Sequence, residues 1–184
     1  MRPRHPRLLA VLMALLLAVL GGGFGTYRGF TALDPAVVVA LPPLEGPVDR
    51  IVVEKAARTL SLMQGEAVLR VYPVALGFAP EGDKERQGDG RTPEGEFRID
   101  RANPDSSYHL SLGLDYPQAE DRTRASAEGY DPGGDIFIHG QPLGLDGARY
   151  IAADWTAGCI AVSDAAMEEI WQVAGIGTVV EVQP

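Results

Sequence analysis

Two residues near the C-terminus could together form a nucleophile and its base. Cys159 is the only cysteine of the chain and lies in the segment DWTAGCIAV, residues 154–162. The only His-Gly pair, His139-Gly140, closes an apolar run twenty residues upstream. Thiolate is the reactive form of cysteine, and a neighbouring imidazolium lowers the thiol pKa from about 8.5 toward roughly 3.5–7.5. The pattern therefore predicts a thiol nucleophile, Cys159, with His139 as its base.

Gly158 lies directly before the cysteine and lacks a Cβ, so the backbone there can approach a substrate carbonyl closely. We expect N–H groups around Gly158 and Cys159 to face the developing oxyanion, where one donor contributes about 10²- to 10³-fold in rate. Purely structural roles are the alternatives: Cys159 as a small buried hydrophobe and His139 as a hydrogen-bonded residue at a strand end.

Other kinds of site fit the sequence less well. A zinc site needs three or four ligands, and only His109 and scattered carboxylates accompany Cys159 and His139, without CxxC or HxxxH spacing. We therefore expect no metal and no cofactor. A papain-like enzyme would carry its cysteine upstream of the histidine, within CGSCW, and here the order is reversed.

The elements that must position this pair are mainly strands. The predicted strands cover residues 50–54, 58–63, 67–76, 96–100, 108–116, 136–139 and 178–182. Turns are predicted at Asn103-Pro104 and at residues 131–134, and short helices at 117–128 and from Ser163 or Asp164 to about Val173. The imidazole of His139 then emerges at the end of a strand, and a loop of nineteen residues returns the chain to Cys159.

Charged residues are unevenly distributed along the chain. The chain has 16 basic and 25 acidic residues; without the three arginines near the N-terminus, 13 basic residues remain and the net charge is −12. Nucleic acid is therefore not an expected partner. Residues 82–95 form a Gly-rich predicted loop, in which we expect Lys84, Arg86 and Arg91 to remain solvated.

The N-terminal region predicts export. A basic head is followed by the uncharged, largely apolar residues 8–25, which would span about 27 Å as a helix, close to the ~30 Å of bilayer hydrocarbon. Because the small-residue cleavage site is poor, we favour an uncleaved inner-membrane anchor over a signal peptide. The expected organisation is a signal peptide or anchor at 1–25, a Pro-rich spacer at 26–47 and one catalytic domain at 48–184. That domain would be periplasmic or otherwise extracytoplasmic, touching the membrane only through residues 1–25.

Two segments resemble the L,D-transpeptidase catalytic domain, also called the YkuD domain. His139-Gly140 through Thr156-Ala157-Gly158-Cys159-Ile160 resembles its signature of HG followed, about sixteen residues later, by S/T-x-G-C-I/V. Upstream, residues 72–77 and 88–97 resemble the family's strand and its TPxG-x-F turn. The resemblance implies a mainly β fold with short helices, a sandwich or small barrel, and a groove that holds the cysteine and histidine.

The resemblance also implies an activity. Family members attack the amide between diaminopimelate, or lysine, and D-alanine in a peptidoglycan stem peptide, which releases D-alanine and leaves a thioester. An amine acceptor, in some members a protein lysine, or water then resolves the thioester. On this basis Cys159 is the nucleophile, His139 the acid/base and Gly140 the candidate carbonyl that orients the imidazole. A hydrolytic relative, either an L,D-carboxypeptidase or a cross-link amidase, and a non-catalytic wall-binding module remain alternatives.

The sequence departs from the family pattern at one position. Many relatives carry Arg directly after C-I/V, whereas this chain has Ala161, so another residue must supply that charge or the substrate differs. Arg149 could hold a substrate carboxylate through a bidentate pair. Trp155 is a candidate groove wall, Thr156 a candidate hydrogen-bonding residue near the thiolate, and Tyr108 a further substrate-binding candidate. A solvated loop, plain packing and turn formation are the corresponding structural alternatives.

Overall fold

The structure is a computed structural model that describes residues 42–145 and 150–184. The chain divides into two units, Met1–Pro42 and Pro43–Pro184. Of the first unit, only Pro42 belongs to the described residues. The predicted anchor at residues 1–25 and the site candidate Arg149 lie outside the described residues. Among the helices that are described, none has the length and apolar character needed to cross a bilayer.

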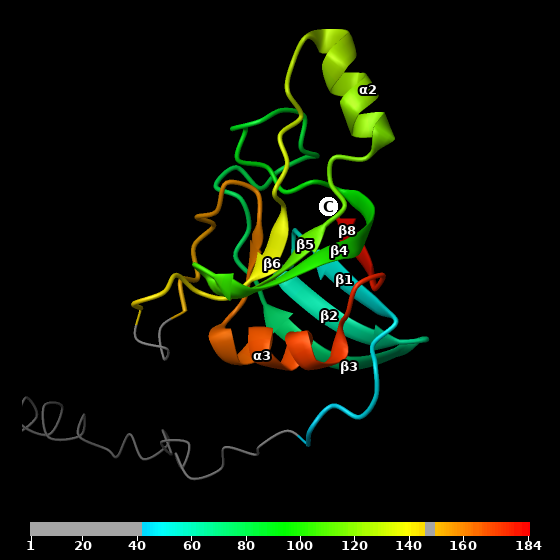
Figure 1. The fold of residues 1–184 in the computed structure, drawn as a ribbon, viewed down its shortest axis with the longest axis vertical. Coiled ribbons are helices and arrows are strands. Elements are labelled where there is room, and N and C mark those ends of the chain that lie inside the picture. Colours follow the sequence, from blue (N-terminus) through cyan, green and yellow to red (C-terminus); the bar gives the residue numbers. More distant parts are fainter. Residues whose placement is uncertain (1–41, 146–149) are drawn as a thin grey trace, which may run out of the picture. The chain divides into compact units, whose positions relative to one another are not determined.

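The described unit is mainly β with two short helices, as the sequence predicted (Figure 1). Its elements are β1 (Arg50–Glu54), β2 (Thr59–Gln64), β3 (Ala67–Pro73), β4 (Gly95–Ser106), β5 (His109–Leu114), α2 (Ala119–Glu128), β6 (Phe137–His139), β7 (Ile160–Ala161), α3 (Asp164–Val173) and β8 (Val179–Gln183). The strand order in the sheet is β3-β2-β1-β8-β4-β5-β6-β7.

The two ends of this strand order meet. Ala75, two residues after β3, donates to the carbonyl of Ala161 in β7 at 2.9 Å and accepts from its N–H at 2.8 Å. Strand β4 links the two halves, because Gly95–Arg98 pairs with β8 while the rest of the strand pairs with β5. The sheet is therefore closed in the manner of a small barrel, and β7 is held from both sides.

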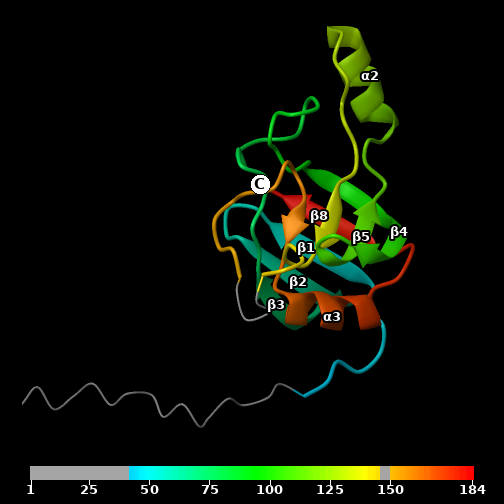
Figure 2. The same cartoon turned by 60° about the vertical axis from the view of Figure 1, so that its left-hand side comes forward.

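The helices differ in how they attach to the sheet. Helix α3 begins at Ser163, whose hydroxyl accepts from the N–H of Ala166, and it packs beside β5 and β6 through Ala166, Met167 and Ile170. Helix α2 stands apart from the sheet in both views (Figures 1 and 2), and Ala125 is its only buried residue. The inward-facing apolar side chains that alternate along the strands form the core together with the buried face of α3.

The sequence analysis was wrong about one turn and missed one strand. The turn predicted at Asn103-Pro104 is part of β4, because the register of β4 and β5 shifts between Asn103 and Ser106. Pro104 therefore sits where the ladder needs no N–H donor. Strand β7 was not predicted, because its two residues are too few to show alternation; its pairing with Ala75 and β6 defines it.

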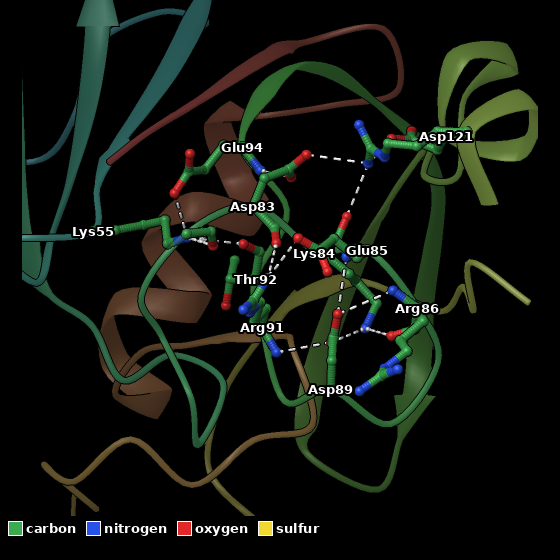
Figure 3. Close-up of polar contacts among 12 residues, drawn as sticks. Lys55, Asp83, Lys84, Glu85, Arg86, Asp89, Arg91, Thr92, Glu94 and Asp121 are labelled. Atoms are coloured by element: carbon green, nitrogen blue, oxygen red, sulfur yellow. Dashed lines mark hydrogen bonds and ion pairs between the residues drawn. The ribbon is translucent and has the colours of Figure 1, made fainter. Parts of the chain in front are cut away.

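The Gly-rich segment between β3 and β4 is a folded support, which corrects the expectation that Lys84 is solvated. Lys84 is 2 % exposed, and its Nζ lies 2.7 Å from Asp89 Oδ1 (Figure 3). The Asp89 carboxylate also accepts from the N–H groups of Glu85, Arg86 and Arg91 at 2.9–3.0 Å. Burial alone would raise the pKa of Asp89, but these hydrogen bonds outweigh it and lower that pKa to about 2.

This arrangement predicts that Asp89→Asn destabilises the domain. The substitution leaves the buried Lys84 ammonium without its counter-charge, which costs about 3–5 kcal/mol of unfolding free energy. Chemical denaturation measures the loss, with the exposed Asp105→Asn as the control that changes stability little. Because the folded pKa of Asp89 is about 2 against 3.8 unperturbed, its contribution is complete above pH 3.8 and lost as the pH falls through about 2. Equal stability of the two variants would contradict the support role.

Candidate active site

Two rows of residues across neighbouring strands form the face of the sheet that carries the site. The first row, across β4, β5 and β6, consists of Arg101, Gly113 and Phe137. The second row reaches β7 and consists of Asn103, Ser111, His139 and Ala161. The row between them, Leu112, Ile138 and Ile160, faces the core and is at most 2 % exposed.

The register of β6 and β7 brings the predicted nucleophile and base together. The two strands are parallel, with Ile138 opposite Ile160 and His139 opposite Ala161. Continuing this register back one residue places Cys159 beside Phe137. Because side chains alternate between faces, Cys159 and His139 share a face of the sheet. Their positions are one strand apart, about 4.8 Å across the strands, and two residues apart, about 6.6 Å along the strand direction. Both side chains line one cavity of about 670 Å³.

The imidazole of His139 is fixed by its own neighbour. His139 is 4 % exposed, and its Nδ1 lies 2.7 Å from the carbonyl oxygen of Gly140. A carbonyl only accepts hydrogen bonds, so Nδ1 carries the proton and Nε2 keeps its lone pair. Gly140 leaves no room for a side chain, because an added Cβ would lie 2.6 Å from Asp164 Oδ1 and 2.8 Å from His109 Cβ. The tautomer is the one that a general base requires.

A tight turn held by Thr156 presents the cysteine. The Thr156 hydroxyl donates to the carbonyl of Cys159 at 2.7 Å and accepts from the N–H of Gly158 at 3.1 Å. The turn is anchored to the segment after β3, because the N–H of Thr156 donates to Leu76 O and its carbonyl accepts from Phe78 N. Thr156 lines the cavity as expected, but its hydroxyl is used to close this turn.

Gly158 has a different role from the one the sequence suggested. Its N–H donates to the Thr156 hydroxyl at 3.1 Å, which occupies the donor that was expected to face an oxyanion. Its φ of +138° and the 2.7 Å that would separate an added Cβ from the carbonyl oxygen of Arg91 explain why glycine is required. The N–H of Cys159 has no hydrogen bond among the described residues, which leaves it as the candidate oxyanion donor.

The Gly-rich segment supports this turn from behind. The Thr92 hydroxyl accepts from the N–H of Gly77 at 3.1 Å, and the Thr92 carbonyl accepts from Lys55 Nζ at 3.0 Å. Lys55 is 2 % exposed and also pairs with Glu94 at 2.7 Å (Figure 3). The buried ammonium thus ties residues 92–94 to β1, and the adjacent Arg91 carbonyl packs against Gly158.

Burial favours the neutral forms of Cys159 and His139, which is opposite in direction to the expected thiolate–imidazolium pair. Burial raises the pKa of the Cys159 thiol and outweighs the hydrogen bond from the Phe137 backbone, while the nearby Asp135 carboxylate raises that pKa further. Burial also lowers the pKa of His139, against the opposing hydrogen bond to Gly140. The Cys159 Sγ–H accordingly donates to the carbonyl of Asp135 at 3.3 Å.

Aromatic rings form one wall of the cavity. The ring of Tyr108 lies 4.7 Å from that of His139 and 5.8 Å from that of Trp155, measured between centroids. Trp155 also meets His139 edge to face at 5.7 Å. Tyr108 and Trp155, two of the four residues proposed as substrate contacts, therefore line the cavity beside the imidazole. The two rings therefore cover the His139 imidazole on the cavity side.

The sequence analysis missed the residues on the other side of the cysteine. Phe137 and Asp135 line the cavity next to Cys159, and Arg101 reaches this region from β4. No signal in the sequence alone marks Arg101, because its alignment with Gly113 and Phe137 depends on the register of β4, β5 and β6. The residue after C-I/V is Ala161, so the charge that many relatives carry at this position is absent. The Ala161 side chain is 0 % exposed.

Comparisons with known proteins identify the family. The sequence model of the L,D-transpeptidase catalytic domain, YkuD, matches residues 48–182. This chain belongs to that family.

Individual relatives agree with this assignment. The chain is 29 % identical over 172 residues to "Putative L,D-transpeptidase YafK" of Escherichia coli K12, covering 90 % of this chain and 63 % of YafK. It resembles the helical cell shape determining protein Pgp2 from Campylobacter jejuni with 28 % identity and a TM-score of 0.58, covering 75 % of this chain and 48 % of Pgp2. An L,D-transpeptidase from Xylanimonas cellulosilytica shares the fold, with 18 % identity, a TM-score of 0.52 and coverage of 76 % and 62 %. The chain thus spans less than two thirds of each of these proteins.

The raised pKa of the Cys159 thiol predicts how this residue reacts with iodoacetamide. Because the thiol pKa is raised, the alkylation rate is expected to stay low through neutral pH and to rise with a midpoint above the ordinary thiol value of 9.0. Asp135→Asn should move the midpoint down, since it removes a negative charge that opposes the thiolate. Mass spectrometry of the adduct against pH measures both. A midpoint below neutrality would show an ionised pair instead.

The turn geometry predicts a matched pair of effects at position 156. Thr156→Val leaves the buried Gly158 N–H unpaired and is expected to cost about 1–3 kcal/mol of unfolding free energy. Thr156→Ser retains the hydroxyl and should stay close to the parent protein. Urea denaturation distinguishes them, and equal stability of the two variants would contradict the role given to the hydroxyl.

Proposed function

We propose that this protein is a cysteine-dependent L,D-transpeptidase acting on peptidoglycan stem peptides. The observation that carries the proposal is the placement of Cys159 and His139 on one face of β6 and β7, within one cavity. Family membership supports the enzyme class, and the family acts on cell-wall peptides. No metal or cofactor takes part in the proposed chemistry.

The reaction follows from the two side chains. A stem tetrapeptide enters the cavity with its terminal amide carbonyl at Sγ of Cys159. His139 Nε2 takes the thiol proton as sulfur attacks, and then gives it to the departing D-alanine nitrogen. The N–H of Cys159 stabilises the oxyanion. The remaining acyl group is held as a thioester until an amine acceptor attacks it.

The wider biological role is part of the same proposal. The apolar N-terminal region favours an extracytoplasmic site of action, with residues 1–25 as the anchor. The likeness to Pgp2, described as a helical cell shape determining protein, supports a role in wall remodelling and cell shape. The acceptor is a second stem peptide or a protein amine. Transfer to water instead would make the protein an L,D-carboxypeptidase or a cross-link amidase.

Incubation with tetrapeptide muropeptides tests this function. We expect release of D-alanine together with cross-linked dimers, and a transient mass increase on Cys159 that corresponds to the tripeptide acyl group. Cys159→Ala should abolish release, and His139→Gln should reduce it by about 10²- to 10⁴-fold, the usual contribution of a general base. Free tripeptide without dimers would identify the hydrolytic alternative. Unchanged tetrapeptide with retained wall binding would identify a non-catalytic binding module.

A further inference from the structure

Arg101 and Asp135 form a charged pair beside Cys159, on the opposite side from His139. Arg101, Gly113 and Phe137 stand in one row across β4, β5 and β6, and Cys159 continues that row. At Gly113 an added Cβ would lie 2.5 Å from Arg101 Cγ and 2.8 Å from its Cζ, so the arginine side chain lies flat across the glycine. Arg101 Cζ stands 4.5 Å from the centroid of the Phe137 ring. The guanidinium is thereby delivered to the immediate neighbour of Cys159.

Asp135 supplies the opposite charge at the same place. Its Oδ1 lies 3.4 Å from Arg101 Nη2, but its side chain is 91 % exposed and it lines the cavity. Its carbonyl accepts from Cys159 Sγ–H, and its φ of 55° is a left-handed conformation unusual for a residue with a side chain. The backbone of Asp135 is thus fixed against the cysteine, while its carboxylate faces solvent. An exposed ion pair at this distance is weakly coupled, so each partner can exchange the other for a charge on a ligand.

The balance of charges defines the class of ligand. Arg101 Nη1 is already bound by the Asp100 carboxylate at 2.8 and 3.0 Å and donates to the Leu114 carbonyl at 3.3 Å. Within residues 42–145 and 150–184, the hydrogen bond of Nη2 is to Asp135 Oδ1. A simple anion would be repelled by Asp100 and Asp135, and a simple cation would be repelled by the Arg101 guanidinium. A ligand with one ammonium and one carboxylate on the same carbon satisfies Asp135 and Arg101 together.

We propose that Arg101 and Asp135 form a subsite for the zwitterionic α-amino-acid end of the acceptor. The proposal rests on the transpeptidase function above and specifies its second substrate. Asp135 attracts the ammonium, which loses one proton to solvent. The neutral nitrogen then bonds to the thioester carbonyl carbon while the C–S bond breaks and leaves its electron pair on sulfur. The remaining extra proton on nitrogen passes through His139 Nε2 to Cys159, which regenerates the thiol.

The test compares two acceptors that differ only in the carboxylate. Glycine and glycinamide are offered to the full chain during turnover of a tetrapeptide donor, and acyl transfer to each is normalised to that variant's own release of D-alanine. Arg101→Met is expected to raise KM for glycine about tenfold or more relative to KM for glycinamide, since only glycine carries the charge that Arg101 binds. Asp135→Asn should raise KM for both. Arg98→Met, in the same strand but bonded to the Gly177 carbonyl, should leave the ratio unchanged.

The outcomes separate the subsite from the enzyme reaction. If Arg101→Met still releases D-alanine but discriminates the two acceptors as the parent protein does, the subsite is wrong and the transpeptidase function stands. Arg101→Lys, which keeps the charge but not the planar fork, should give an intermediate ratio if the subsite is correct. If the parent protein forms no thioester and releases no D-alanine, the proposed function fails, and the subsite fails with it.

Discussion

The parallel register of β6 and β7 is the constraint on which the site depends. A shift of one residue would turn Cys159 toward the core and place Ile160 in the cavity, because alternate side chains point to opposite faces. Two strands of three and two residues are too short to fix a register by themselves. The paired hydrogen bonds between Ala75 and Ala161 supply the missing restraint from the other side. Closure of the sheet is therefore also what positions the nucleophile.

Burial and reactivity oppose each other in this site. The aromatic wall and the closed sheet remove His139 and Cys159 from water, which favours their neutral forms and leaves the thiol a weaker nucleophile at rest. A protonated thiol is also slower to oxidise. The backbone contacts counteract only part of this: Gly140 orients the imidazole and the Phe137 N–H assists the sulfur. In the proposed mechanism, the pair becomes fully reactive only when a substrate carbonyl is present to take the charge.

The sequence contained much of the fold and the central pair, but little of what surrounds them. Alternating strands, the β–helix order and the HG and TAGC segments depend on local patterns, so β1, β2, β6 and α3 could be predicted almost to the residue. Strand β7, the extension of β4 through Pro104 and the burial of Lys84 depend on pairing between distant segments. The directions of the Cys159 and His139 pKa shifts also escaped prediction, because they follow from how deeply each group is buried.

The glycines illustrate the same division. Gly158 was expected to open space for a substrate, yet the contact that excludes a side chain there comes from the Arg91 carbonyl, 67 residues upstream. Gly113 drew no attention in the sequence, although it creates the path by which Arg101 crosses β5. In both cases the missing Cβ makes room for another part of the protein. The charge that is absent at Ala161 in β7 can thus be supplied by Arg101 from β4, three positions away in the sheet, since Gly113 in β5 lets the long arginine side chain lie across that strand.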